Sequence, residues 1–214
     1  TDWSDNNEAY EEAVKAYAER LFAPDNRAFH DDFDAVLKPF TAAGRINALS
    51  QTLIKLTAPG IPDIYQGAEG EDLSLVDPDN RRAIDFDKLA KTLSTDDQSS
   101  WSDAIKAGTA KQRLIAAGLA LRTAQPDLFA AGDYQPLEIS GSKRDHAAAY
   151  LRTHGDDAVL VIVPRLPLGL YSEGAADWGD TAVALPANLA NRSLTNRLTS
   201  AETKIGETLR LADL

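Results

Sequence analysis

The spacing of hydrophobic residues changes once along this 214-residue chain, near residue 132. Before that point, hydrophobic residues recur every three or four positions, as they do on one face of an amphipathic helix. After Tyr134, short segments that favour strands are separated by Gly, Pro, Asn and Asp. The chain is therefore predicted to be an α+β protein, mainly helical over residues 1–132, with an antiparallel β domain over residues 133–214.

Four helices are expected in the first part. The first covers residues 8–22, the second is expected to end around Pro39, and the third ends at Ala58-Pro59-Gly60, because proline and glycine terminate helices. A fourth covers residues 103–124, with a weak point at Gly108. The apolar run over residues 61–65 reads as a short buried strand.

The second part contains six segments that favour strands. They cover residues 135–139, 147–153, 158–166, 181–185, 193–199 and 208–211. Within the first part, after the apolar run over residues 61–65, residues 67–85 show little periodicity. A loop of this length inside a compact domain is usually functional or disordered.

The composition excludes several classes of function. The net charge of −11 disfavours nucleic acid and anionic membranes as partners. The chain has no cysteine and three scattered histidines, so neither a metal site nor a cofactor is expected. No apolar run is long enough to span a membrane, and a cytoplasmic location is favoured. The chain starts at Thr1 and contains no methionine, which suggests a piece of a larger protein.

The residues suited to binding chemistry follow the predicted strand. An aromatic ring can stack on a sugar ring, and carboxylate, amide and guanidinium groups can bond adjacent sugar hydroxyls. In a (β/α)₈ barrel, sites are built at this end of a strand. The candidate substrate-binding residues are Tyr65, Gln66, Glu69, Asp77, Asn80 and Arg81.

The same stretch resembles a known group of enzymes. Gly60, Pro62, Tyr65, Gly67 and Glu69 resemble the last barrel strand of the α-amylase superfamily, and the Asp77-Pro78-x-Asn80-Arg81 sequence resembles the loop that follows it. More specifically, residues 54–67 and 73–82 resemble the maltooligosyl trehalose synthase family. The resemblance continues at Trp3 and residues 7–11, 128–129, 132–134 and 161–166, so it covers nearly the whole chain.

The resemblance implies a fold and an activity. It implies the last helices and last strand of a (β/α)₈ barrel, followed by a β-sandwich-like C-terminal domain. The family converts the reducing-end α-1,4 bond of a maltooligosaccharide into an α,α-1,1 bond by retaining intramolecular transglucosylation. The family's three catalytic carboxylates would precede Thr1, so no catalytic residue is assigned in this chain. Asp77 and Arg81 match positions that hold the sugar.

Several alternatives stay open. Asp77 and Arg81 could instead form an ion pair on the surface. Tyr65 could instead belong to the hydrophobic core. The acidic residues Glu69, Glu71 and Asp72 could instead form a solvated loop. At residues 70–72 the chain has Gly-Glu-Asp, whereas the family often has an aromatic residue immediately before the aspartate that corresponds to Asp72.

Other functions and partners are also considered. The chain could be a non-catalytic α-glucan-binding module, with a row of exposed aromatic residues on its β domain, or a small hydrolase that uses carboxylates of residues 69–85. As a fragment, it would be inactive alone. It would bind maltooligosaccharide only within the full-length enzyme and pack against the N-terminal remainder of its barrel. In isolation it would self-associate or be partly disordered over residues 1–130.

Overall fold

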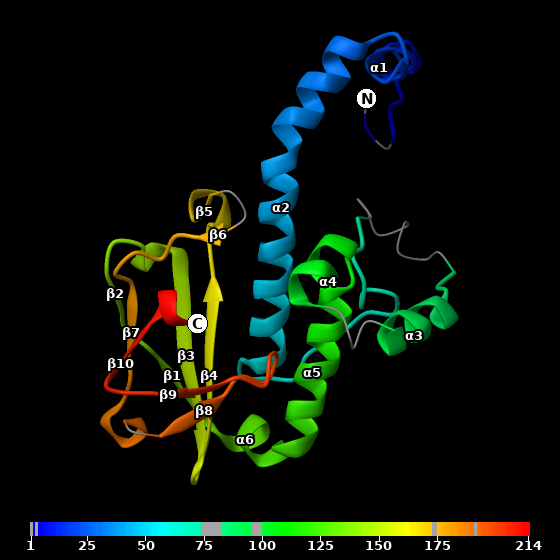
Figure 1. The fold of residues 1–214 in the computed structure, drawn as a ribbon. Coiled ribbons are helices and arrows are strands. Elements are labelled where there is room, and N and C mark those ends of the chain that lie inside the picture. Colours follow the sequence, from blue (N-terminus) through cyan, green and yellow to red (C-terminus); the bar gives the residue numbers. More distant parts are fainter. Residues whose placement is uncertain (1, 3, 74–82, 96–99, 173–174, 191) are drawn as a thin grey trace. The chain divides into compact units, whose positions relative to one another are not determined.

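The computed structural model describes all residues except 1, 3, 74–82, 96–99, 173–174 and 191 (Figure 1). The chain divides into two compact units, an N-terminal unit (Thr1–Ala42) and a C-terminal unit (Ala43–Leu214). Helices and strands are mixed, as the α+β prediction requires. Across the described residues, no helix combines the length and the hydropathy that a membrane crossing needs.

The N-terminal unit is a pair of helices. Helix α1 (Glu8–Leu21) begins at Asn7, whose side-chain oxygen accepts a hydrogen bond from the backbone N–H of Tyr10 at 3.1 Å. The turn after α1 leads into the first part of α2 (Arg27–Thr57). The helix predicted over residues 8–22 is confirmed.

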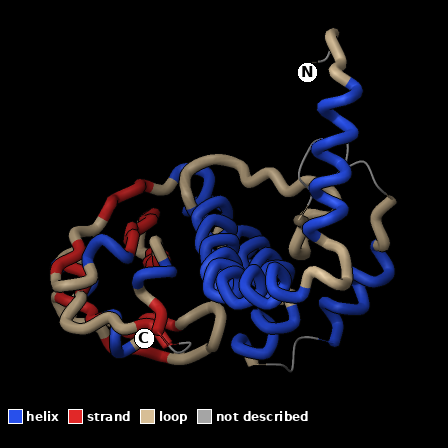
Figure 2. Tube along the Cα trace, turned by 90° about the horizontal axis from the view of Figure 1, so that it is seen from above, coloured by secondary structure: helices blue, strands red, loops and turns tan. Residues whose placement is uncertain are grey.

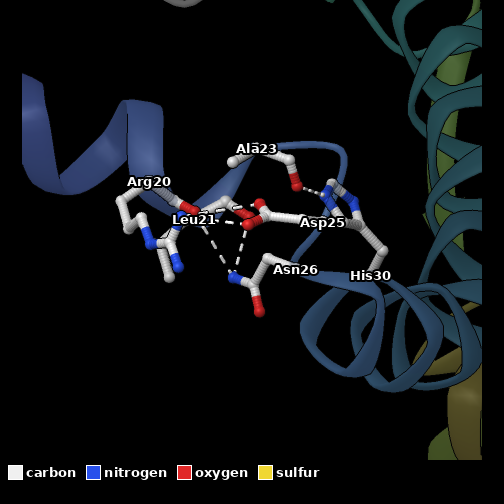
Figure 3. Close-up of polar contacts among 6 residues, drawn as sticks. All are labelled: Arg20, Leu21, Ala23, Asp25, Asn26 and His30. Atoms are coloured by element: carbon white, nitrogen blue, oxygen red, sulfur yellow. Dashed lines mark hydrogen bonds and ion pairs between the residues drawn. The ribbon is translucent and has the colours of Figure 1, made fainter.

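Side chains fix the turn between α1 and α2 (Figure 3). The amide nitrogen of Asn26 donates to the carbonyl of Leu21 at 3.1 Å, and His30 Nε2 lies 3.3 Å from the carbonyl of Ala23. Arg20 and Asp25 form an exposed ion pair at 3.3 Å. The Asn26 contact satisfies a carbonyl that the end of α1 leaves without a helical partner.

The apolar face of the N-terminal unit is exposed to solvent. No residue of α1 is buried. Eight large apolar side chains of this unit are each between 42% and 66% exposed: Tyr10, Val14, Tyr17, Phe22, Phe33, Val36, Leu37 and Phe40. A helix in a folded protein normally buries such a face.

Helix α2 corrects one prediction. It runs without interruption through Pro39, where the sequence was expected to end a helix. A proline removes one backbone N–H and strains one turn, but it does not by itself reverse the chain. The flanking residues Lys38 and Phe40 to Ala43 include no glycine or asparagine that would turn the backbone, so the helix continues.

Over its described residues, the C-terminal unit contains the end of α2 and four shorter α-helices. The predicted helix over residues 103–124 is two helices, separated where Gly108 takes a φ of +76° at the end of the first. The predicted weak point is therefore a break. The helices are α3 (Phe86–Thr95), α4 (Trp101–Ala107), α5 (Ala110–Ala124) and α6 (Pro126–Ala131).

The strands of this unit are short and all pair in antiparallel fashion. One sheet has the order β1-β3-β4 and a second has the order β10-β7-β2, and two further pairs are β5-β6 and β8-β9. The six predicted segments all contain strands. The bounds are β1 (Asp133–Pro136), β2 (Ile139–Ser140), β3 (Ala147–His154), β4 (Asp157–Pro164), β5 (Tyr171–Ser172), β6 (Ala175–Ala176), β7 (Ala182–Ala184), β8 (Ser193–Thr195), β9 (Glu202–Lys204) and β10 (Thr208–Arg210).

Helices and sheets share a core within this unit, where the strands gather beside the helices (Figures 1 and 2). Tyr150, Val161 and Val163 pack against Leu53 and Ile54 of α2. A second apolar cluster lies among the strands and includes Ala147, Ala149, Leu151, Val183, Leu185, Leu189, Ile205, Leu209 and Leu211. The helix-to-strand switch at residues 131–133 therefore lies inside one compact unit, and the predicted domain boundary there stays a prediction.

Candidate functional site

The segment that carries the candidate residues starts where α2 ends. Gly60 has a φ of +118°, a conformation that favours glycine, and it turns the chain away from the helix. The guanidinium group of Arg122 on α5 donates to the carbonyls of Leu56 and Gly60, both at 3.0 Å. The predicted helix end at residues 58–60 is confirmed, and Arg122 anchors it.

The buried strand predicted over residues 61–65 is wrong. This segment forms no strand, and Ile61 is 94% exposed. A strand is stabilised by backbone hydrogen bonds to a neighbour. All sheets of the described residues are built from Asp133 onward, so the segment has no strand beside it.

A tight turn holds three of the candidate residues. The N–H of Ala68 donates to the carbonyl of Tyr65 at 2.9 Å, and Gly67 between them has a φ of +82°. A Cβ added at Gly67 would lie 2.5 Å from the Cδ1 atom of Ile84. Glycine is therefore required here by both conformation and space.

The turn separates the candidate side chains by exposure. Tyr65 is half exposed and Gln66 is exposed, so Tyr65 does not belong to a core in this structure. Glu69 differs from them: its Oε2 atom is buried and has no hydrogen-bond partner among the described residues. A buried carboxylate oxygen without a partner is costly, and in native proteins it calls for an explanation.

Basic residues of α2 and α5 lie beside the acidic residues after this turn. Arg45 bonds Glu71 through two nitrogen–oxygen contacts, at 2.9 and 3.4 Å. Partial burial, reinforced by the charge of Lys55, lowers the pKa of Lys111, and nearby carboxylates including Glu69 oppose that shift. Within the acidic stretch, Glu71 is therefore ion-paired with Arg45.

The remaining candidate residues, Asp77, Asn80 and Arg81, lie outside the described residues, and their binding role stays a prediction. In the part of the chain that is described, no group of three His, Asp or Glu side chains could hold a metal ion. The arrangement of Tyr65, Gln66 and Glu69 suits hydrogen bonding and stacking with a polar ring and includes no obvious nucleophile–base pair.

Two arginines were missed by the sequence analysis. Arg122 anchors the turn at Gly60, and Arg152 donates to the carbonyl of Thr57 at 3.0 Å. Both partners lie more than 60 residues away in the chain. The sequence did contain one signal for Arg152: it is a charged residue within the otherwise apolar strand predicted over residues 147–153. A charged side chain in such a strand needs a buried hydrogen-bond partner.

The β domain does not present the row of exposed aromatic residues expected of a glucan-binding module. Tyr150 is buried, Trp178 packs against the strand core, and Tyr171 is half-buried. Tyr134 is 47% exposed. The structure therefore gives that alternative no support from these four residues.

Comparison with known proteins gives matches along the whole chain. No protein-family model matches it. The chain is 32% identical over 203 residues to a Mycobacterium tuberculosis protein named as a maltooligosyl trehalose synthase, which covers 95% of the chain and 24% of that protein. A mutant of the maltooligosyltrehalose synthase from Arthrobacter ramosus is 34% identical with a TM-score of 0.79 and covers 100% of this chain and 26% of that one.

A second solved maltooligosyl trehalose synthase is 25% identical, with a TM-score of 0.72 over 98% of this chain and 26% of that one. The chain thus spans about a quarter of the length of these relatives. The family resemblance predicted from the motifs is confirmed.

Proposed function

We propose that this chain is the C-terminal part of a maltooligosyl trehalose synthase. The whole protein converts the reducing-end α-1,4 bond of a maltooligosaccharide into an α,α-1,1 bond by retaining intramolecular transglucosylation. The observation that carries this proposal is the match to enzymes of that name over nearly the full chain but only a quarter of their length.

In this proposal, residues 1–132 supply the last helices and last strand of a (β/α)₈ barrel, and residues 133–214 form a sandwich-like β domain. The match to the family over nearly the full chain supports this assignment. In the whole barrel, neighbouring strands would pair with residues 61–65, which form no strand in this chain. The exposed apolar side chains of α1 and the first part of α2 provide further support. The preceding part of the polypeptide would cover both, and without it the fragment would self-associate.

The candidate residues hold the sugar and do not react with it. Tyr65 would stack on a sugar ring, while Gln66 and Glu69, with Asp77, Asn80 and Arg81, would bond its hydroxyls. The nucleophile, the acid–base and the third carboxylate would come from the preceding part of the barrel, so the 214-residue chain alone is inactive. Because transfer competes with hydrolysis, the closed site must also exclude water while the released glucose is rotated.

The test uses the full-length protein encoded by the same reading frame. We expect Asp77→Ala and Arg81→Ala each to lower kcat/KM for maltoheptaose by about 100-fold or more, because they misplace the sugar at the reacting bond. Matched controls are Asp79→Ala and Arg82→Ala, which remove the same charges from the same loop. The assignment fails if the controls lose as much activity as the two candidate variants.

A further inference from the structure

The C-terminal unit contains a cleft outside the described candidate residues Tyr65, Gln66 and Glu69. It has a volume of about 730 Å³, within the range of small-molecule sites. Its walls come from α3, from α4 and α5, and from the turn between β8 and β9 at residues 197–200. Of the candidate binding residues that the structure describes, Tyr65, Gln66 and Glu69 do not line it.

Contacts between distant segments hold the walls of this cleft. The indole N–H of Trp101 on α4 donates to the carbonyl of Leu198 in the β8–β9 turn at 2.8 Å. The guanidinium carbon of Arg113 on α5 lies 4.4 Å from the centroid of the Trp101 ring. The side chain of Gln112 on α5 donates to the carbonyl of Leu89 on α3 at 2.9 Å. The cleft is therefore set by tertiary packing.

The charge of the lining differs from that of the chain. The chain has a net charge of −11, yet the cleft is lined by the two guanidinium groups of Arg113 and Arg197 and by no Asp or Glu among the described residues. Arg197 is exposed, and no hydrogen bond or ion pair of its side chain is found in the described part of the chain. Its donors are available to a ligand.

The rest of the lining combines polar and apolar groups. Hydroxyls are supplied by Thr92, Ser100, Thr109, Thr199 and Ser200, and the apolar surface by Trp101 with Leu93, Ala116 and Ala117. Sugar rings carry hydroxyls that both donate and accept, and they also carry apolar C–H faces. A lining of hydroxyls and guanidinium groups around an aromatic and alkyl floor fits that pattern.

We propose that this cleft is a second α-glucan-binding site, in addition to the one proposed for residues 65–81. It binds part of a long maltooligosaccharide away from the end that reacts. The inference rests on the proposed function, because that function supplies the ligand class. It predicts that the enzyme favours long glucans over short ones and that the cleft carries this preference.

The test compares two independent variants in the full-length protein. Arg197→Ala removes the available guanidinium group, and Ala117→Leu fills the cleft without removing a polar group. Each should raise KM for a long maltodextrin by about five- to tenfold relative to KM for maltotetraose, as the loss of one charged hydrogen bond or of steric access requires. Arg210→Ala, an exposed arginine on β10, is the matched control and should leave the ratio unchanged.

Direct binding separates this inference from the proposed function. β-Cyclodextrin is a closed α-1,4 glucan without a reducing end, so its binding can be titrated without turnover. Weaker binding in both variants supports the cleft even if the protein forms no α,α-1,1 product, a result that would refute only the proposed function. If both variants bind β-cyclodextrin and discriminate chain length as the wild type does, the cleft is not a glucan site.

Discussion

Replacing Arg152 with methionine should destabilise the C-terminal unit strongly. Arg152 lies on β3 and is 1% exposed. Its guanidinium group donates to the carbonyls of Thr57, Asp133 and Gly132 at 3.0–3.1 Å, and to those of Leu128 and Phe129 at 3.1 and 3.4 Å. One side chain thus ties the end of α2, the end of α6 and the start of β1 to β3.

The size of the effect follows from the carbonyls that lose their donor. Four of the five, all except the Asp133 carbonyl on β1, lie in or just after the last turns of α2 and α6, where carbonyls attract a positive charge. Methionine keeps much of the apolar volume and supplies no N–H. Each orphaned buried carbonyl costs about 1–3 kcal/mol, and with partial relaxation and water entry we expect a total loss of about 3–5 kcal/mol.

Urea unfolding followed by circular dichroism measures this loss. It corresponds to a fall in Tm of about 6–20 °C for a protein of this size. Arg152→Lys, which keeps the charge but offers fewer and differently placed donors, should fall between wild type and Arg152→Met. Arg210→Met, at an exposed site, should change the free energy of unfolding by less than about 0.5 kcal/mol. A loss below about 1 kcal/mol in Arg152→Met would refute the reasoning.

Three further predictions concern helix packing, a buried phenol and the internal proline. Gly118→Ala would place a Cβ 2.7 Å from the Cδ1 atom of buried Leu56, so calorimetry should show a net loss of about 1–2 kcal/mol despite the higher helix propensity of alanine. Burial raises the pKa of Tyr150 above its ordinary value of 10.0. The stability that the protonated phenol contributes to the fold is therefore complete below pH 10 and is lost as the pH rises through the raised pKa. Tyr150→Phe should therefore cost about 1 kcal/mol at neutral pH, through the lost 2.6 Å hydrogen bond to Thr57, and unfolding curves should converge with wild type in alkali. Pro39→Ala should raise the helical ellipticity and stabilise α2 by up to about 3 kcal/mol, and an unchanged spectrum and stability would contradict that expectation.

Local patterns in the sequence predicted much of the fold. Tyr10, Val14 and Tyr17 recur at helical spacing, and α1 forms there. Gly108 was identified as a weak point, and its positive φ ends α4. Such signals act within a few residues, so they can be read without knowledge of the tertiary structure.

The failures depend on interactions that the local sequence does not contain. The run over residues 61–65 has a strand-like composition, but a strand needs a neighbour, and the described residues supply none. The carbonyls that Arg122 and Arg152 bind come from distant segments. The helix end predicted at Pro39 was wrong, because the loss of one backbone hydrogen bond costs less than the remaining turns of the long helix α2 contribute. At the candidate site, the motif located Tyr65 and Gln66, while the buried, unpartnered oxygen of Glu69 emerged only from the structure.

The central claim is tested most directly by product analysis on two proteins, the 214-residue chain and the full-length product of its reading frame. Each is incubated with maltoheptaose, and the anomeric linkages are assigned by nuclear magnetic resonance. The account predicts a non-reducing product with an α,α-1,1 linkage from the full-length protein and no change in maltoheptaose with the 214-residue chain. Formation of that linkage by the 214-residue chain alone, or only shorter reducing sugars from the full-length protein, would contradict it.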